Sequence, residues 1–170
     1  MIFLIVGCGG RENIICSKLS NNINDIYCIG QWINPDIEIM CKDYKKCELT
    51  EDNILNYCKE IIPNIIVIGP ETILDTNFVK KCKELEFNCI GPTPDLAQLE
   101  TSKAFTRNFL NEIGMKEYNP YYCNMVSGYS ISNIDFKDEI VIKLDGLAGG
   151  KGVFVQGDHF KNQQDGLVIA

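Results

Sequence analysis

The chain has little histidine, little positive charge and no long apolar segment. It holds one histidine, and its 16 lysines and arginines stand against 23 aspartates and glutamates, a net charge of −7. Proteins that bind nucleic-acid phosphates present a basic surface, so we expect no nucleic-acid partner. No apolar run approaches the roughly 20 residues of a membrane-spanning helix. The run from Met1 to Val6 lacks the length and basic flank of a secretory signal. We therefore expect a cytoplasmic protein that acts on small molecules and has no membrane partner.

The nine cysteines also lack the spacing of a metal site. None forms a Cys-x-x-Cys pair, and the single histidine is His159. A zinc site is therefore not expected, and we predict no metal ligands in this chain. Several cysteines, Cys58 and Cys82 among them, occupy apolar positions of periodic segments. That placement is typical of buried free thiols in a reducing compartment.

What the chain does contain is a glycine-rich segment between two apolar runs, residues 140–144 and 153–155. Its glycines are Gly146, Gly149, Gly150 and Gly152. The pattern predicts strand, turn and strand. Glycine N–H groups can close over an anion, and Lys143 and Lys151 add positive charge beside them. Lys143 interrupts what reads as a buried strand. We expect a flexible lid over nucleotide phosphates, with an ordinary hairpin loop as the alternative. A Walker A loop is excluded because Gly152 replaces its Ser or Thr.

Before that segment, short apolar runs alternate with helical patterns. The expected strands are Ile2–Val6, Ile26–Ile29, Ile65–Ile68 and Cys89–Ile90, and the expected helices lie at 11–19, after Thr50 up to Pro63, at 78–85 and from Pro94. This alternation predicts an α/β fold with a parallel, doubly wound sheet. Ligands bind beyond the carboxyl ends of such strands, so loops 7–12, 69–72 and 91–94 should share one crevice. We place a domain boundary near residues 93–100.

After the boundary we expect a helix over residues 103–113, with Phe105, Phe109 and Ile113 on one side. Residues 118–123 are aromatic and predicted to be extended. Asp158, His159 and Asp165 lie in a polar stretch that we interpret as surface. The apolar residues 168–170 are expected to begin another strand.

Five segments carry a family resemblance when they are taken together. They are residues 7–12 (GCGGRE), 68–71 (IGPE), 91–93 (GPT), 97–105 (AQLETSKAF) and 141–153. Their order and spacing closely resemble glycinamide ribonucleotide synthetase, or phosphoribosylamine–glycine ligase, of the ATP-grasp superfamily. The resemblance implies a Rossmann-like pre-ATP-grasp domain at 1–94 and an incomplete ATP-grasp domain at 95–170. It also implies a ligase of purine biosynthesis that uses ATP and Mg²⁺ to join glycine to 5-phosphoribosylamine through glycyl phosphate.

The same resemblance implies two groups of site residues. The substrate side would be Gly9, Gly10, Arg11, Glu12, Glu71, Gly91 and Thr93, and the ATP side Lys103, Lys143, Asp145, Gly146, Gly149, Gly150, Lys151 and Gly152. The chain departs from the family at Asn13, where histidine is usual, and at residues 29–35, which replace a Pro-Gly-Asn loop. Family members are considerably longer, so we expect a fragment or truncated form whose magnesium ligands lie in the missing part.

Other function classes stay open at this stage. A nicotinamide-dependent oxidoreductase would explain the Gly7-x-Gly9 turn, but its fingerprint needs glycine at position 12, where Glu12 would repel a pyrophosphate. A non-catalytic module or half-enzyme that binds phosphoribosyl ligands is the main alternative. A sister ATP-grasp ligase is a third, and residues 98–105 and 145–152 favour the glycine ligase over it.

Overall fold

The chain folds into two compact units. The structure is a computed structural model that describes residues 1–20, 25–125 and 138–169. Its units comprise Met1–Ala97 and Gln98–Ala170. Within the described residues, no helix combines the length and the apolar character needed to cross a membrane.

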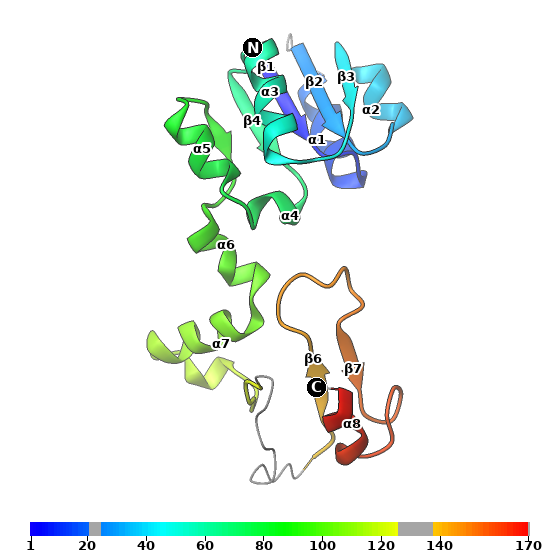
Figure 1. The fold of residues 1–170 in the computed structure, drawn as a ribbon, viewed down its shortest axis with the longest axis vertical. Coiled ribbons are helices and arrows are strands. Elements are labelled where there is room, and N and C mark those ends of the chain that lie inside the picture. The colour runs from blue at the N-terminus through cyan, green and yellow to red at the C-terminus, as the bar shows by residue number, and fades with distance from the viewer. Residues whose placement is uncertain (21–24, 126–137, 170) are drawn as a thin grey trace. The chain divides into compact units, whose positions relative to one another are not determined.

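The first unit contains a five-stranded parallel sheet in the order β3-β2-β1-β4-β5 (Figure 1). The strands are β1 (Ile2–Val6), β2 (Asp25–Gly30), β3 (Asp43–Lys46), β4 (Ile65–Ile68) and β5 (Cys89–Ile90). The register aligns Val6 with Ile29 on one side and with Ile68 on the other. The carboxyl ends of the three central strands therefore meet at one edge. The predicted α/β class and parallel sheet are confirmed.

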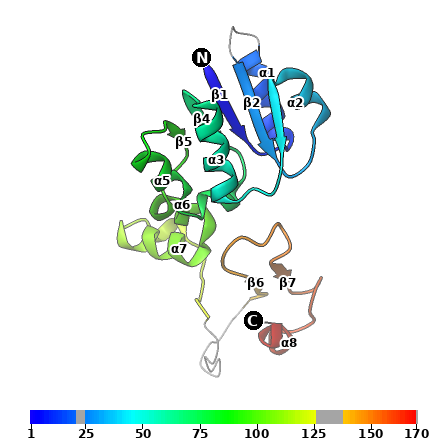
Figure 2. The same ribbon diagram turned by 45° about the horizontal axis from the view of Figure 1, so that its top comes forward.

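Helices cover both faces of this sheet (Figure 2). One face carries α1 (Gly10–Ser20) and α2 (Pro35–Met40), and the other carries α3 (Glu51–Ile61), α4 (Glu71–Leu74) and α5 (Phe78–Glu84). Successive strand residues point to opposite faces, so Ile5 packs toward α1 and α2 while Leu4 packs toward α3. Cys58 and Cys82 are buried free thiols, as predicted.

N-cap residues begin both α3, which the sequence predicts, and α2, which it does not. Thr50 accepts the Asn53 N–H at 3.2 Å and begins α3, as its sequence predicts. Neither α2 nor β3 was predicted, because residues 35–46 are too short and mixed for a clear period. The signal that was available is Asn34 followed by Pro35, an N-cap residue before a proline at the first helical position.

The second unit begins within α6 (Pro94–Thr101) and continues with α7 (Lys103–Glu112), which Ser102 caps. A 3-10 turn, η1 (Lys116–Tyr118), follows where the sequence indicated extended chain from residue 118. The predicted hairpin is present: β6 (Val141–Lys143) pairs antiparallel with β7 (Val153–Val155). Phe105 and Phe109 stack with their ring centroids 6.2 Å apart.

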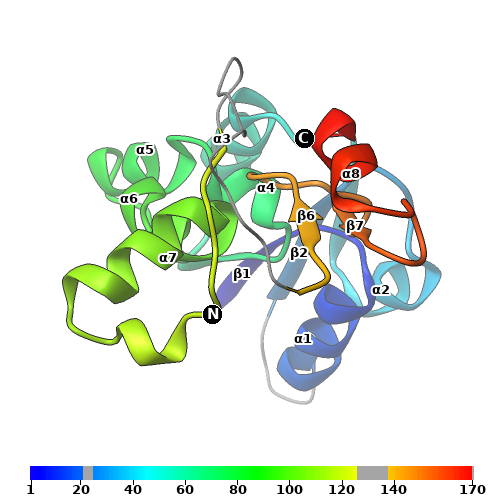
Figure 3. The same ribbon diagram turned by 90° about the horizontal axis from the view of Figure 1, so that it is seen from below.

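Two expectations for this unit were wrong. Residues 168–169 do not begin a strand but end α8 (Gln163–Ile169), which Figure 3 labels, and residue 170 lies outside the described residues. A Cβ at Gly166 of this helix would meet Phe160 and Ile142. The two apolar residues are too few to decide between the two element types. Strand β6 is also not buried, since Val141 is 51% exposed and Lys143 is exposed. Lys143 therefore does not interrupt a buried strand.

We expect the stability of the first unit to depend on the side chains buried in its sheet core. Leu4→Ala removes a fully buried side chain from the central strand and should lower the free energy of unfolding by about 3 kcal/mol. Ile39→Ala, at a position 84% exposed on α2, is the matched control and should change it by less than about 0.5 kcal/mol. Urea denaturation followed by circular dichroism measures both. Equal effects of the two substitutions would contradict the assigned core.

Candidate functional site

The turn between β1 and α1 is built around a buried carboxylate. Glu12 is only 4% exposed, and its Oε2 accepts the Gly9 N–H at 2.6 Å. Its Oε1 accepts the Arg11 Nε–H at 3.1 Å. Charge-assisted hydrogen bonds of this kind are roughly twice as strong as neutral ones. Glu12 thus fixes the turn and the base of the Arg11 guanidinium together.

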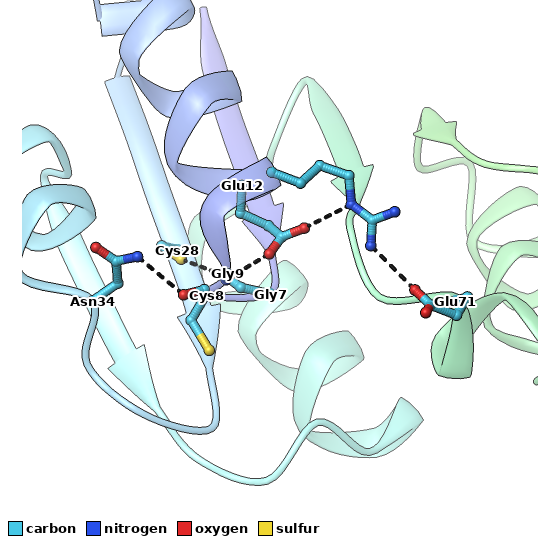
Figure 4. A network of polar contacts seen from close by, with 8 residues as sticks. Gly7, Cys8, Gly9, Glu12, Cys28, Asn34 and Glu71 are labelled. Carbon is cyan, nitrogen blue, oxygen red and sulfur yellow. Dashed lines mark hydrogen bonds and ion pairs between the residues drawn. The ribbon is translucent and has the colours of Figure 1, made fainter. Parts of the chain in front are cut away.

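Two glycines make room for that carboxylate. A Cβ at Gly7, which has φ 116°, would lie 2.9 Å from both Glu12 and Pro70, and a Cβ at Gly69 would overlap the Glu12 carboxylate. Figure 4 shows Glu12 between the Gly7–Gly9 turn and the loop that carries Glu71. The loops that follow β1 and β4 are therefore packed against the same side chain.

Arg11 connects those two loops at the surface. Its Nη2 lies 3.2 Å from Glu71 Oε2, and both side chains are exposed. The backbone N–H of Glu71 itself and the Arg11 guanidinium hold the pKa of Glu71 below its usual range. An exposed ion pair contributes little stability. The ion pair instead orients the Arg11 side chain. It keeps the guanidinium beside the start of α1, where backbone N–H groups favour an anion.

The loop after β2 is attached to the same turn. Asn34 Nδ2 donates to the Cys8 carbonyl at 3.1 Å, and the Cys28 thiol donates to the Gly7 carbonyl at 3.2 Å (Figure 4). These contacts were not predicted, because the loop was judged only by its departure from the family pattern. An Asn before Pro35 could have indicated the cap, but nothing in the sequence indicates the contact with Cys8.

The third predicted loop, 91–94, has different neighbours. A Cβ at Gly91 would approach Leu74, Ile68 and Val79. Thr93 lines a shallow hollow of about 200 Å³ together with Asn77, Lys80, Pro94 and Asp95. Loops 7–12 and 69–72 thus meet where Glu12 packs against Gly69 and Arg11 contacts Glu71, whereas the place of Gly91 and Thr93 in the same crevice stays a prediction.

In the second unit, three of the predicted ATP residues, Lys103, Asp145 and Gly146, make contacts at the start of α7. Asp145 Oδ1 accepts the backbone N–H groups of Lys103 at 2.6 Å and Ala104 at 3.2 Å, and Ser102 Oγ donates to Oδ2 at 2.9 Å. Burial alone would raise the pKa of Asp145, but these hydrogen bonds outweigh it and hold that pKa below its usual range. Asp145 therefore binds the helix start and ties the glycine loop to α7.

The lysines of the predicted ATP side differ in their contacts and in their exposure. Lys103 Nζ donates to the Gly146 carbonyl at 3.0 Å, so this ammonium lies against the glycine loop. Lys143 and Lys151 are exposed. Gly149 and Gly150 have φ of 54° and 78°, a region that favours glycine, which accounts for both residues at the bend. Gly152 lies next to Ala148 and Leu144, where a side chain would collide.

Magnesium is not accommodated by the described side chains. Across residues 1–20, 25–125 and 138–169, no group of three or more histidine, cysteine, aspartate or glutamate side chains could hold a metal ion. Mg²⁺ needs oxygen ligands in near-octahedral arrangement. Asp145, the one carboxylate among the candidate ATP residues, already accepts the N–H groups at the start of α7.

A family model, phosphoribosylglycinamide synthetase, N domain, matches residues 1–100. The chain belongs to this family. Among curated relatives, phosphoribosylamine–glycine ligase of Methanobrevibacter smithii is 30% identical over 97% of this chain and 38% of its own length. That of Thermococcus kodakarensis is 33% identical over 100% of this chain and 40% of its own. The chain thus spans about two fifths of the length of these curated relatives.

Solved structures agree on the fold. N5-carboxyaminoimidazole ribonucleotide synthetase from Thermotoga maritima has a TM-score of 0.70 at 17% identity, covering 99% of this chain and 43% of that one. Phosphoribosylamine–glycine ligase from the same organism has a TM-score of 0.55 at 22% identity, covering 91% of this chain and 36% of that one. At these identities the likeness shows a shared fold, and the family match shows the membership.

The hydrogen bonds of Glu12 should stabilise the turn between β1 and α1. Glu12→Gln keeps the shape but loses the charge that receives Gly9 and Arg11, so the free energy of unfolding should fall by about 2 kcal/mol. Glu38→Gln, at an exposed position on α2, is the control and should change it by less than about 0.5 kcal/mol. Chemical denaturation measures both. An unchanged stability in Glu12→Gln would show that the carboxylate does not hold the turn.

The stability that Asp145 contributes should depend on pH. Because its folded pKa lies below the ordinary value of 3.8, its contribution is present above that value and is lost as the pH falls through the folded pKa. Asp145→Asn should therefore be less stable than the parent chain at pH 7, and the gap should close below about pH 4.

Thermal unfolding of the parent chain and of Asp145→Asn between pH 7 and pH 2.5 tests this pH dependence. Asp158→Asn, exposed in the same unit, is the matched control and should track the parent chain at every pH. A stability gap for Asp145→Asn that stays constant down to pH 2.5 would mean that the carboxylate does not act through its charge.

Proposed function

We propose that this chain carries the phosphoribosylamine site and part of the ATP site of a ligase that forms glycinamide ribonucleotide in purine biosynthesis. The observation that carries the proposal is the Glu12-anchored turn at the carboxyl edge of the sheet, where Arg11 Nη2 lies 3.2 Å from Glu71 Oε2. Membership of the family and the names of its curated relatives supply the reaction class.

The proposed chemistry explains why positive charge is needed twice. A carboxylate is a poor electrophile, so the γ-phosphoryl group of ATP is transferred to a glycine carboxylate oxygen, giving glycyl phosphate and ADP. The amine of 5-phosphoribosylamine then attacks the carbonyl carbon, and inorganic phosphate leaves. Donors must stand where charge develops in both steps. Arg11 would hold the sugar phosphate, while Lys103, Lys143 and Lys151 would hold the nucleotide phosphates.

The remaining site residues take supporting roles in this proposal. Glu12 is a positioning residue, because its oxygens are occupied by Gly9 and Arg11. Glu71 is exposed enough to bind ribose hydroxyls or the amine, and Gly91 and Thr93 would extend that side. Asp145 would hold the glycine loop, residues Gly146, Gly149, Gly150 and Gly152, at the start of α7. We keep residues 1–94 and 95–170 as the proposed domains of a soluble, cytoplasmic enzyme.

The same turn argues against a nicotinamide-dependent oxidoreductase. In the dinucleotide-binding fingerprint, the third glycine stands in the first turn of the helix and lets that helix pack closely against its strand. Here Glu12 takes that position, and its buried carboxylate accepts the Gly9 N–H at 2.6 Å. A pyrophosphate bound at the Gly9 N–H would have to displace this carboxylate, whereas the proposed sugar phosphate is held by Arg11.

Binding of ribose 5-phosphate tests the proposal. Arg11→Ala removes the guanidinium at the α1 start and should weaken binding by about tenfold, the loss of a charge-assisted contact of about 1.4 kcal/mol. Lys18→Ala, exposed in the last turn of the same helix, is the matched control and should leave affinity within twofold, about 0.4 kcal/mol. Isothermal titration calorimetry measures each. Equal affinities for the parent chain and Arg11→Ala would overturn the proposed substrate side.

A second candidate, a phosphoribosyl-binding module without catalysis, is favoured by one observation. The contacts of the substrate turn are complete within the first unit, while the described residues offer no magnesium ligands. We expect the 170-residue chain by itself to give no glycine-dependent ADP release in a coupled assay. A rate of order 1 per second or more, ordinary for an enzyme, would decide against that expectation.

A further inference from the structure

The loop between β2 and α2 stands beside the proposed phosphate site. The Gly7 N–H donates to the Ile29 carbonyl at 2.9 Å, and Asn34 Nδ2 donates to the Cys8 carbonyl at 3.1 Å. A Cβ at Gly30 would lie 2.7 Å from the Cys8 Cβ. Residues 30–34 therefore leave the sheet at the same edge as the glycine turn and are packed against it.

This loop holds Trp32 by its backbone and leaves its side chain in solvent. The Tyr44 hydroxyl donates to the Trp32 carbonyl at 2.8 Å, while Asn34 Oδ1 accepts the Asp36 N–H at 3.2 Å and fixes the start of α2. The Trp32 side chain is nonetheless 57% exposed, with Ile33 beside it at 37%. Tryptophan is highly buried on average in folded proteins. A fixed loop that presents an indole at the ligand edge of an α/β sheet is suited to binding.

We propose that Trp32 is a specificity-determining residue that covers the sugar ring of a bound phosphoribosyl ligand. The inference rests on the proposed function, because Arg11 and the start of α1 must hold the phosphate for the ring to reach the loop. The indole offers a flat apolar face to the C–H groups of ribose and an N–H for a hydroxyl. Inorganic phosphate has no C–H ring to cover the indole face, so Trp32 distinguishes a phosphoribosyl compound from phosphate alone.

Trp32 is the only tryptophan of the chain, so its fluorescence reports on this site alone. Ribose 5-phosphate should change the emission of the parent chain with the same midpoint as the calorimetric signal, and inorganic phosphate should bind without that change. Trp32→Ala should weaken ribose 5-phosphate about five- to tenfold, the size of an aromatic contact, and leave inorganic phosphate unchanged. Trp32→Phe should retain most of the affinity, and Ile39→Ala, exposed on α2, should retain all of it.

The outcomes separate the two proposals. If the parent chain gives no heat with ribose 5-phosphate, the proposed function fails and this inference fails with it. If the chain binds ribose 5-phosphate while Trp32 emission stays constant and Trp32→Ala keeps its affinity, only the inference is overturned. Circular dichroism of each variant checks folding, and the emission of the parent chain decides the question even if Trp32→Ala does not fold.

Discussion

The first unit depends on one buried carboxylate. Glu12 receives the Gly9 N–H and the Arg11 Nε–H, and it fills the space that Gly7 and Gly69 leave open. A buried ionised group without partners is costly, so these hydrogen bonds are a condition of its burial. The packing of Glu12 against Gly69 and the contact of Arg11 with Glu71 join the segments that follow two neighbouring strands. The same contacts that allow Glu12 to be buried therefore bring Arg11 and Glu71 together.

The second unit uses a carboxylate for a related purpose. Asp145 follows β6 by two residues, yet its oxygens receive the first N–H groups of α7, about 40 residues earlier in the chain. The cap joins the glycine loop to the helix that carries Lys103. In the proposed ligase the loop that covers the phosphates and a lysine that binds them would then be held at one point. Acidic residues position the cationic ones in both units.

The sequence predicted the parts that are set by local pattern. The strand runs, the Thr50 cap and the hairpin around the glycine loop depend on periodicity and turn residues, and all are present. The roles of Glu12 and Asp145 were beyond the sequence, because each is set by partners from other elements. Glu12 was placed with the substrate contacts although its oxygens are taken by Gly9 and Arg11. Strand β6 was predicted to be buried from its apolar residues. The apolar content of a strand does not show whether another element packs against it, and Val141 is exposed.

The central claim is that a phosphoribosyl group binds at the Glu12-anchored turn. Amide chemical shifts of the ¹⁵N-labelled chain, followed by NMR during titration with ribose 5-phosphate, test it most directly, because each backbone N–H reports for itself. We expect the largest shifts on Gly9, Gly10 and Arg11, with a second group at residues 69–72. Shifts confined to the glycine loop at residues 146–152, or to the hollow around Asn77 and Lys80, would contradict it.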